Sequence, residues 1–208
     1  MSFQAFQRAV VDLTLSYSKV RTLREGDGTL LASYDLTPLE RHRIVAIVSQ
    51  PGMAVHCSLS RGNRLEVVVN AFPMTCVLLE SQLRALIDEL WEQRRPANYQ
   101  LAGEEDAFAE YIGRRIAVGE LSVEYLPEIL GYETTCLEMI REHRVQGPWD
   151  AAIERLVEFR HSPADLLPPL ARLSPPPPGL PPGSYPSRVR LHDGRFDVKR
   201  IACNAITA

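Results

Sequence analysis

A dense cluster of prolines separates two stretches of this 208-residue chain that differ in character. Ten of the sixteen prolines fall between Pro163 and Pro186, and four of them are consecutive, from Pro175 to Pro178. Consecutive prolines fix φ and lack the N–H that a helix interior or a central strand requires, so they favour extended polyproline II. We therefore predict an α+β fold: an N-terminal all-α helical domain (1–147), then a small antiparallel β-sheet of about three strands (148–208), with residues 163–186 as a stiff linker.

Two signals mark helix ends in the first half of the chain. Thr37 to Glu40 is a capping box with proline at the first helical position, which predicts a helix that stops at Gln50-Pro51-Gly52. Phe72-Pro73 interrupts an apolar helical pattern, because proline cannot donate a hydrogen bond and clashes with the preceding turn. We expect residues 3–24 to form one amphipathic helix, and residues 53–59 to be a loop or a single helical turn.

Arg61, Asn63 and Arg64 place three polar side chains directly before the apolar pattern that ends at Phe72. Asn63 is a favourable helix N-cap, because its side-chain oxygen can accept a free backbone N–H of the first turn. Two interpretations stay open. These side chains cap helices and bridge to an inward-facing acid such as Glu133, or they form an interface with a partner protein.

Apolar residues at three- and four-residue spacing predict further helices up to residue 147. One covers Cys76 to Trp91, and another begins at Glu104, where three consecutive acids suit the positive end of a helix dipole, and ends at Gly119. A third covers Val123 to Arg144, with Pro127 in its first turn.

The C-terminal part carries the clearest β signal. Asp193-Gly194 lies between two alternating runs, residues 188–191 and 196–201, which is typical of a β-hairpin with a tight turn. Residues 152–160 also alternate and predict a strand, and residues 163–173 favour a short helix. An unpaired strand of such a sheet presents a row of free N–H and C=O groups that can pair with an extended peptide.

Composition excludes some classes of protein. The formal net charge is −3, which does not indicate a nucleic-acid or membrane partner. The N-terminus lacks the features of a signal peptide, and no window approaches 18 uninterrupted apolar residues, so we expect no membrane span. The four cysteines are far apart, which fits buried thiols in a cytoplasmic protein better than disulfides or a zinc site.

Candidates for catalysis are weak. His56-Cys57 could be a base and a nucleophile, but neighbours in sequence rarely face each other in the required geometry. Glu133 with Glu138, or Glu128 with His143, could ligate a metal, yet their spacing is not that of a ligand motif, and a solvated acidic helix face explains them better. No Gly-rich phosphate loop occurs. We expect no catalytic residue and no metal ligand in this chain.

Several pieces of the sequence, taken in order, resemble a known bacterial family. They are Arg61 to Leu65, Phe72-Pro73, the leucines before Trp91, Phe108 with Tyr111, and Tyr125 to Glu133. This order resembles the MbnC-like family, whose members have carried a DNA-binding, domain-of-unknown-function label and typically show Y-R-N-N, F-P and L-P-Y-L-x-x-L-A-x-L-E. Ser60 and Gly62 depart from the first of these motifs.

The resemblance implies a function. Proteins of this family are partner subunits of multinuclear non-heme iron oxidative enzymes that act on ribosomally made precursor peptides. The chain would then be a non-catalytic subunit of a heterodimer. It would bind the precursor's leader by strand addition and hold no cofactor of its own, since the iron belongs to the partner enzyme. The helical domain would dock on that enzyme, through residues that include Arg61, Asn63 and Arg64.

The expected leader-binding residues lie on the predicted hairpin. Its apolar positions would set the register of the added strand, and its basic flank would suit an acidic leader, an expectation that rests on charge alone. The residues are Val189, Leu191, Phe196 and Val198 for the apolar set, and Arg188, Arg190, Lys199 and Arg200 for the basic set.

Two alternatives come from other classes of protein. The family label suggests a DNA-binding transcriptional regulator, although no helix carries the basic stripe and the Asn/Arg readout expected for the major groove. A free-standing enzyme ranks last, because no acid, base or metal set converges in the sequence.

Overall fold

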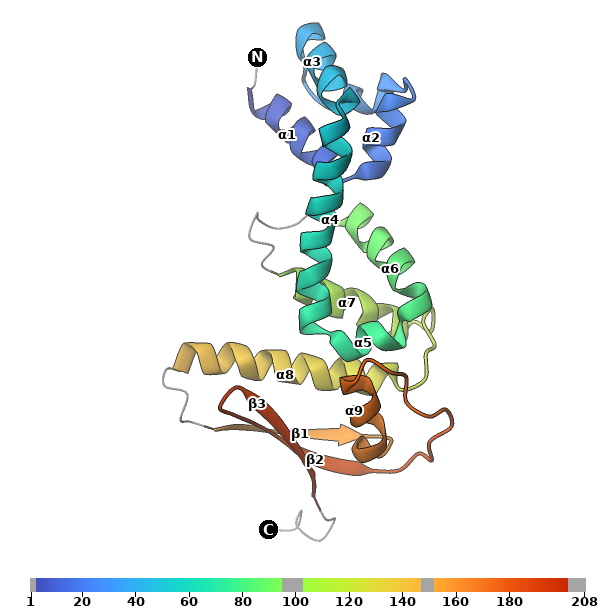
Figure 1. The fold of residues 1–208 in the computed structure, drawn as a ribbon, viewed down its shortest axis with the longest axis vertical. Helices are drawn as coiled ribbons and strands as arrows, with labels where there is room; N and C mark the ends of the chain where they lie inside the picture. Colours follow the sequence, from blue (N-terminus) through green and yellow to red (C-terminus); the bar gives the residue numbers. More distant parts are fainter. Residues whose placement is uncertain (1–2, 95–102, 147–151, 202–208) are drawn as a thin grey trace. The chain divides into compact units, whose positions relative to one another are not determined.

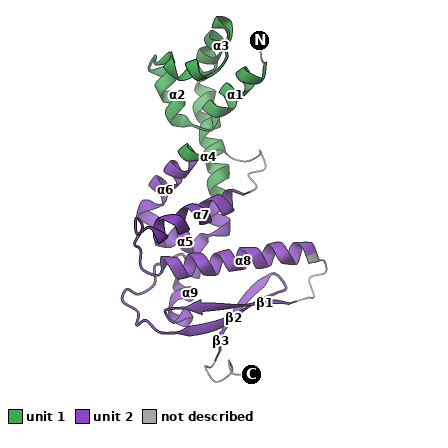
Figure 2. Ribbon diagram, turned by 180° about the vertical axis from the view of Figure 1, so that it is seen from behind, with its two compact units in different colours: residues 1–67, 92–95 green, residues 68–91, 96–208 purple. Residues whose placement is uncertain are grey.

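A computed structural model describes residues 3–94, 103–146 and 152–201 of the protein (Figure 1). The chain divides into two compact units, which are described separately here (Figure 2). The first unit holds Met1–Val67 with Glu92–Arg95, and the second holds Val68–Trp91 with Pro96–Ala208. The domain boundary predicted at residues 147/148 thus falls inside the second unit.

Helices alone form the first unit. Its elements are α1 (Phe3–Thr14), α2 (Tyr17–Arg24), the 3-10 helix η1 (Gly28–Ser33), α3 (Pro38–Ser49) and the first part of α4 (Pro51–Ala71). Their apolar faces share one core, which includes Leu13, Val20, Leu31, Ile44 and Val48. The capping box is confirmed: the Thr37 Oγ1 accepts from the Glu40 amide, and the Glu40 carboxylate accepts from the Thr37 amide.

Two predictions for the first unit are wrong. The single helix expected over residues 3–24 is two, because Ser16 is extended (φ −136°) and its Oγ caps α2 by accepting from Lys19 N. The loop expected at residues 53–59 belongs to α4, which begins at Pro51 and continues to Ala71. Met53 and Cys57 are buried one helical turn apart, so tertiary packing holds this weakly patterned stretch in the helix.

The second unit combines helices with a sheet. Its helices are α5 (Pro73–Leu78), α6 (Glu80–Gln93), α7 (Glu104–Ala117), α8 (Leu126–Gln146) and α9 (Pro163–Ala171), and its strands are β1 (Ile153–Phe159), β2 (Tyr185–His192) and β3 (Arg195–Arg200). The break at Phe72-Pro73 is confirmed, since α4 ends at Ala71 and α5 starts at Pro73. The helix expected from Cys76 to Trp91 is two, which meet at Leu79.

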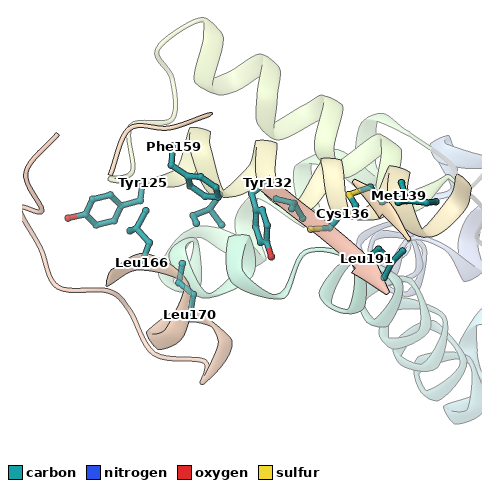
Figure 3. Close-up of a cluster of buried hydrophobic side chains, with 11 residues drawn as sticks. Tyr125, Tyr132, Cys136, Met139, Phe159, Leu166, Leu170 and Leu191 are labelled. Atoms are coloured by element: carbon teal, nitrogen blue, oxygen red, sulfur yellow. The ribbon is translucent and has the colours of Figure 1, made fainter. Parts of the chain in front are cut away.

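The strands of the described residues form one antiparallel sheet in the order β1-β2-β3. α8 lies along one face of this sheet, and α9 closes the same core (Figure 1). Tyr132, Cys136 and Met139 of α8 meet Phe159 of β1 and Leu191 of β2 in that core (Figure 3). The predicted α+β class, with helices followed by a small three-stranded sheet, is confirmed.

The proline-rich segment does not tether the sheet to the helices. Its first part is α9, and the whole segment connects β1 to β2 within the same sheet. The Tyr125 hydroxyl donates to the Pro177 carbonyl at 2.9 Å and accepts from the Leu180 amide at 3.0 Å. The stiff-linker interpretation is therefore wrong, because the prolines are fastened to the start of α8.

Candidate peptide-binding edge

The β2–β3 hairpin has the tight turn that Asp193-Gly194 predicts. Asp193 and Gly194 have φ values of +50° and +68°, the left-handed pair that a type I′ turn requires. In the resulting register, His192 faces Arg195 and Arg190 faces Asp197. The two-residue turn thus fixes which main-chain groups of β3 point toward β2.

Alternate residues of β3 direct their main-chain groups to opposite sides. In a two-residue hairpin the pair that flanks the turn, here His192 and Arg195, is hydrogen-bonded, and the pattern then repeats every second residue. The Ile201 amide donates to the Pro186 carbonyl at 2.8 Å, which agrees with this parity. It follows that the N–H and C=O groups of Phe196, Val198 and Arg200 face away from β2.

This outer side of β3 is an open edge. Among the described residues β3 pairs with β2 alone, so the outward N–H and C=O groups have no strand partner there. The side chains of Phe196 and Val198 are half-buried and pack against the core beside α8. A strand added at this edge would therefore gain main-chain hydrogen bonds and two apolar neighbours.

The apolar residues predicted to bind peptide separate into two groups. Val189 and Leu191 lie on the central strand and are 0% and 2% exposed, so their side chains belong to the core. Phe196 and Val198 lie on the edge strand and keep part of their surface. The sequence could not make this distinction, because strand order decides which strand of a hairpin is at the edge.

The predicted basic residues also fall into two groups, which lie on opposite faces of the sheet. Arg188 and Arg190 lie on the uncovered face of the sheet, where the Nε of each is 3.7 Å from the Glu154 carboxylate. Lys199 shares that face and its Nζ is 2.9 Å from Asp197. Arg200 points to the other face, with its guanidinium 4.7 Å from the Tyr185 ring centroid. The basic flank is thus interleaved with acids, which reduces its attraction for an acidic peptide.

β1 forms the second edge of the sheet, and it suits an acidic peptide less. By the same parity, Glu154, Leu156 and Glu158 direct their main-chain groups away from β2. Two of these three residues are acidic and would repel an acidic peptide. We therefore place the candidate site at β3.

The residues predicted to contact a partner protein lie within α4. Asn63 is exposed and lies in the interior of the helix, so the predicted N-cap role is wrong. Arg64 is 2% exposed, and its Nη2 donates to the Arg94 carbonyl at 3.4 Å. Arg61 is half-buried. Of the three side chains, Asn63 is thus exposed, Arg61 is partly exposed and Arg64 is buried.

Glu133 caps the helix that follows the Phe72-Pro73 break. Its carboxylate accepts from the amides of Met74 and Thr75 at 2.7 and 2.8 Å, and it is 4% exposed. Burial raises the pKa of Glu133, and the hydrogen bonds from Thr75 and Met74 offset part of this rise. The sequence indicated an inward-facing acid here but not the α5 amides as its partners.

The cysteines described by the structure are buried free thiols. Cys57 donates to the Leu13 carbonyl, and burial raises the pKa of its thiol. Burial also raises the pKa of Cys76 and of Cys136 to about 12, so both stay protonated at neutral pH. A protonated, buried thiol is a poor nucleophile.

A polar cluster at the start of α8 was not predicted. The Glu128 carboxylate lies 2.5 Å from the Nδ1 of His161 and also accepts from the amides of Arg160 and His161. The Tyr125 ring meets the His161 ring edge-on, with centroids 4.8 Å apart. Tyr125 has a φ of +65°, and its burial and hydrogen bonds hold that conformation. The cluster fixes the end of β1 to α8.

No group of three or more His, Cys, Asp or Glu residues in the described ranges is arranged to hold a metal ion. None of the described helices is both long and apolar enough to cross a bilayer. No family model and no curated protein matches this chain.

Proposed function

We propose that the chain is a non-catalytic subunit that binds the leader of a ribosomally made precursor peptide at the β3 edge and presents it to an iron-dependent oxidative enzyme. One observation carries the binding step: the main-chain N–H and C=O groups of Phe196, Val198 and Arg200 face away from β2. The half-buried side chains of Phe196 and Val198 lie at the same edge. Such an edge pairs with an extended peptide of variable sequence, because main-chain hydrogen bonds supply affinity.

The side chains at the edge would add modest selectivity. Phe196 and Val198 favour apolar peptide residues on the side of the sheet that faces α8. On the uncovered face, an acidic peptide residue would compete with Asp197 for Lys199. We therefore expect apolar contacts to contribute more to the affinity than charge, and binding to weaken only slightly at high salt.

The identity of the partner enzyme rests on the motif resemblance. Members of the resembled family work as heterodimers with multinuclear iron enzymes, and the iron and the oxidation belong to that partner. In this chain the thiols of Cys76 and Cys136 are buried and their pKa is raised, so neither is suited to act as a nucleophile.

A proline substitution tests the binding step. The Val198 N–H faces outward, so Val198→Pro removes a donor to the added strand and leaves the β2–β3 hydrogen bonds in place. The neighbouring genes are first searched for a short open reading frame that encodes a precursor; its leader, labelled with fluorescein, is then the probe and is titrated with the full chain. Val198→Pro should weaken binding by about tenfold or more, which corresponds to roughly 1.4 kcal/mol.

Val198→Thr is the matched control, since it keeps the β-branched shape and the N–H. It should bind the labelled leader nearly as tightly as the original chain, and circular dichroism should show both variants folded. Hydrogen exchange adds a second measurement: bound leader should slow exchange at the Phe196, Val198 and Arg200 amides. Equal affinity of the proline variant and the original chain would rule out strand addition at β3.

A further inference from the structure

The β3 edge is complementary to itself. Its outward main-chain groups belong to Phe196, Val198 and Arg200, and Val198 is the middle one of the three. Its uncovered-face side chains include Asp197 and Lys199, which carry opposite charges on either side of Val198. A strand with this symmetric arrangement can pair in antiparallel orientation with a second copy of itself.

The charges select one register for such a pair. When Val198 faces Val198 of the second copy, Asp197 of each copy faces Lys199 of the other. Two pairs of opposite charges then form. A shift by two residues in either direction places Asp197 against Asp197, or Lys199 against Lys199. Like charges directly opposite each other destabilise a strand pair, whereas opposite charges stabilise it. A larger shift in one direction would involve the Asp193-Gly194 turn, which is not extended, and in the other direction it would place Arg200 against Arg200.

The other face of the strand agrees with the same register. Val198 would meet Val198 of the second copy, and Phe196 would meet Arg200 of that copy. Arg200 already lies 4.7 Å from the centre of an aromatic ring, that of Tyr185, so its side chain is on the face where Phe196 projects. Stacking of a guanidinium on an aromatic ring is favourable.

We propose that a second copy of this chain occupies the β3 edge, in an antiparallel pair centred on Val198, and that this homodimer competes with peptide. The competition rests on the proposed function, whereas the pairing rests on the edge alone. The free protein would then shield its own binding strand, and peptide would have to displace the second copy. The pair is short, so the dimer is transient and depends on concentration.

Charge-swap variants test the pairing with the full chain. Asp197 and Lys199 have side chains 56% and 77% exposed, so their replacement should leave the fold intact. Sedimentation velocity over about 1 µM to about 1 mM should show a concentration-dependent dimer for the original chain. Asp197→Lys alone and Lys199→Asp alone should each be monomeric, because each places like charges opposite each other. The double variant, Asp197→Lys with Lys199→Asp, should dimerise again.

A mixture of the two single variants is the sharpest measurement. Two copies of the same single variant place like charges opposite each other. One copy of each variant places opposite charges at positions 197 and 199, so an equimolar mixture should form a heterodimer. A monomeric original chain at every concentration would overturn the proposal, and so would a dimer that the single variants leave unchanged.

Peptide binding and pairing can fail independently. If labelled leader binds the β3 edge but the original chain never dimerises, the homodimer is wrong and the proposed function stands. If the dimer responds to the charge swaps but leader does not bind, the proposed function is wrong and the pairing stands. If both hold, adding leader to the dimer should convert it to a monomeric complex.

Discussion

Glu133 caps the helix that begins after the break at Phe72-Pro73. Proline at the start of α5 leaves the next amides without helical partners, and Phe72 offers no side-chain cap. The Glu133 carboxylate reaches from α8 to the amides of Met74 and Thr75 and replaces the missing cap. These two hydrogen bonds join α5 to α8 through residues that are 59 and 58 positions apart in sequence.

Replacement of Glu133 by alanine should cost about 3 kcal/mol of the free energy of unfolding, because the buried Thr75 amide and the part-buried Met74 amide lose their acceptor. Urea unfolding of the variant and the original chain measures this difference. Glu138→Ala, on the same helix, is the control and should cost about 0.5 kcal/mol or less. Equal effects of the two replacements would contradict the capping role.

The raised pKa of Glu133 predicts a pH dependence with a definite sign. Burial raises the pKa in the folded state above its usual value near 4.5, so the folded protein holds this proton to higher pH than the unfolded chain does. The part of the stability that comes from binding this proton is complete below pH 4.5 and is lost as pH rises through the folded-state pKa. Relative to Glu133→Gln, the original chain should therefore lose stability as pH rises from 4.5 through the folded-state pKa. A stability difference that stays constant over this range would contradict the assignment.

At the scale of elements, local signals identified helix ends and the hairpin, and tertiary packing decided the rest. The capping box at Thr37, the break at Phe72-Pro73 and the turn at Asp193-Gly194 are each set by residues within a few positions of one another. The course of α4 through residues 53–59 depends on the burial of Met53 and Cys57, which no local pattern announces.

The candidate site was only partly predictable for a related reason. Alternation along the hairpin identified the strands that carry Val189 and Val198, but only the strand order shows that the first is in the core and the second at the edge. Likewise, the contacts of Arg188 and Arg190 with Glu154 follow from the register of β2 against β1. Non-local pairing of this kind is absent from any short window of sequence.

Gly194 offers a prediction at this scale. Its φ of +68° is disfavoured for residues with a Cβ, so Gly194→Ala should destabilise the hairpin by about 1 kcal/mol. Thermal unfolding and leader titration should both show the loss, since the β3 edge needs an intact turn. Gly194→Asn is the matched control, because asparagine tolerates the left-handed region better. A larger loss for Asn than for Ala would contradict the turn assignment.

At the scale of the whole molecule, the proposed function needs a second protein. Co-expression of this chain with an iron enzyme encoded beside it should yield a stable complex in gel filtration. Leader binding should survive in that complex, because the β3 edge has no partner strand among the described residues of this chain. Two separate peaks, each with one protein, would contradict the partner assignment.

The parity of β3 also has a consequence for the ligands this edge can recognise. Residues of an incoming strand alternate between the side that faces α8 and the side that faces water, and only the former meet Phe196 and Val198. A library of bound sequences should therefore show restricted amino acids at every second position and near-random choice between them. A preference at every second residue would let peptides of unrelated sequence bind the same edge strand.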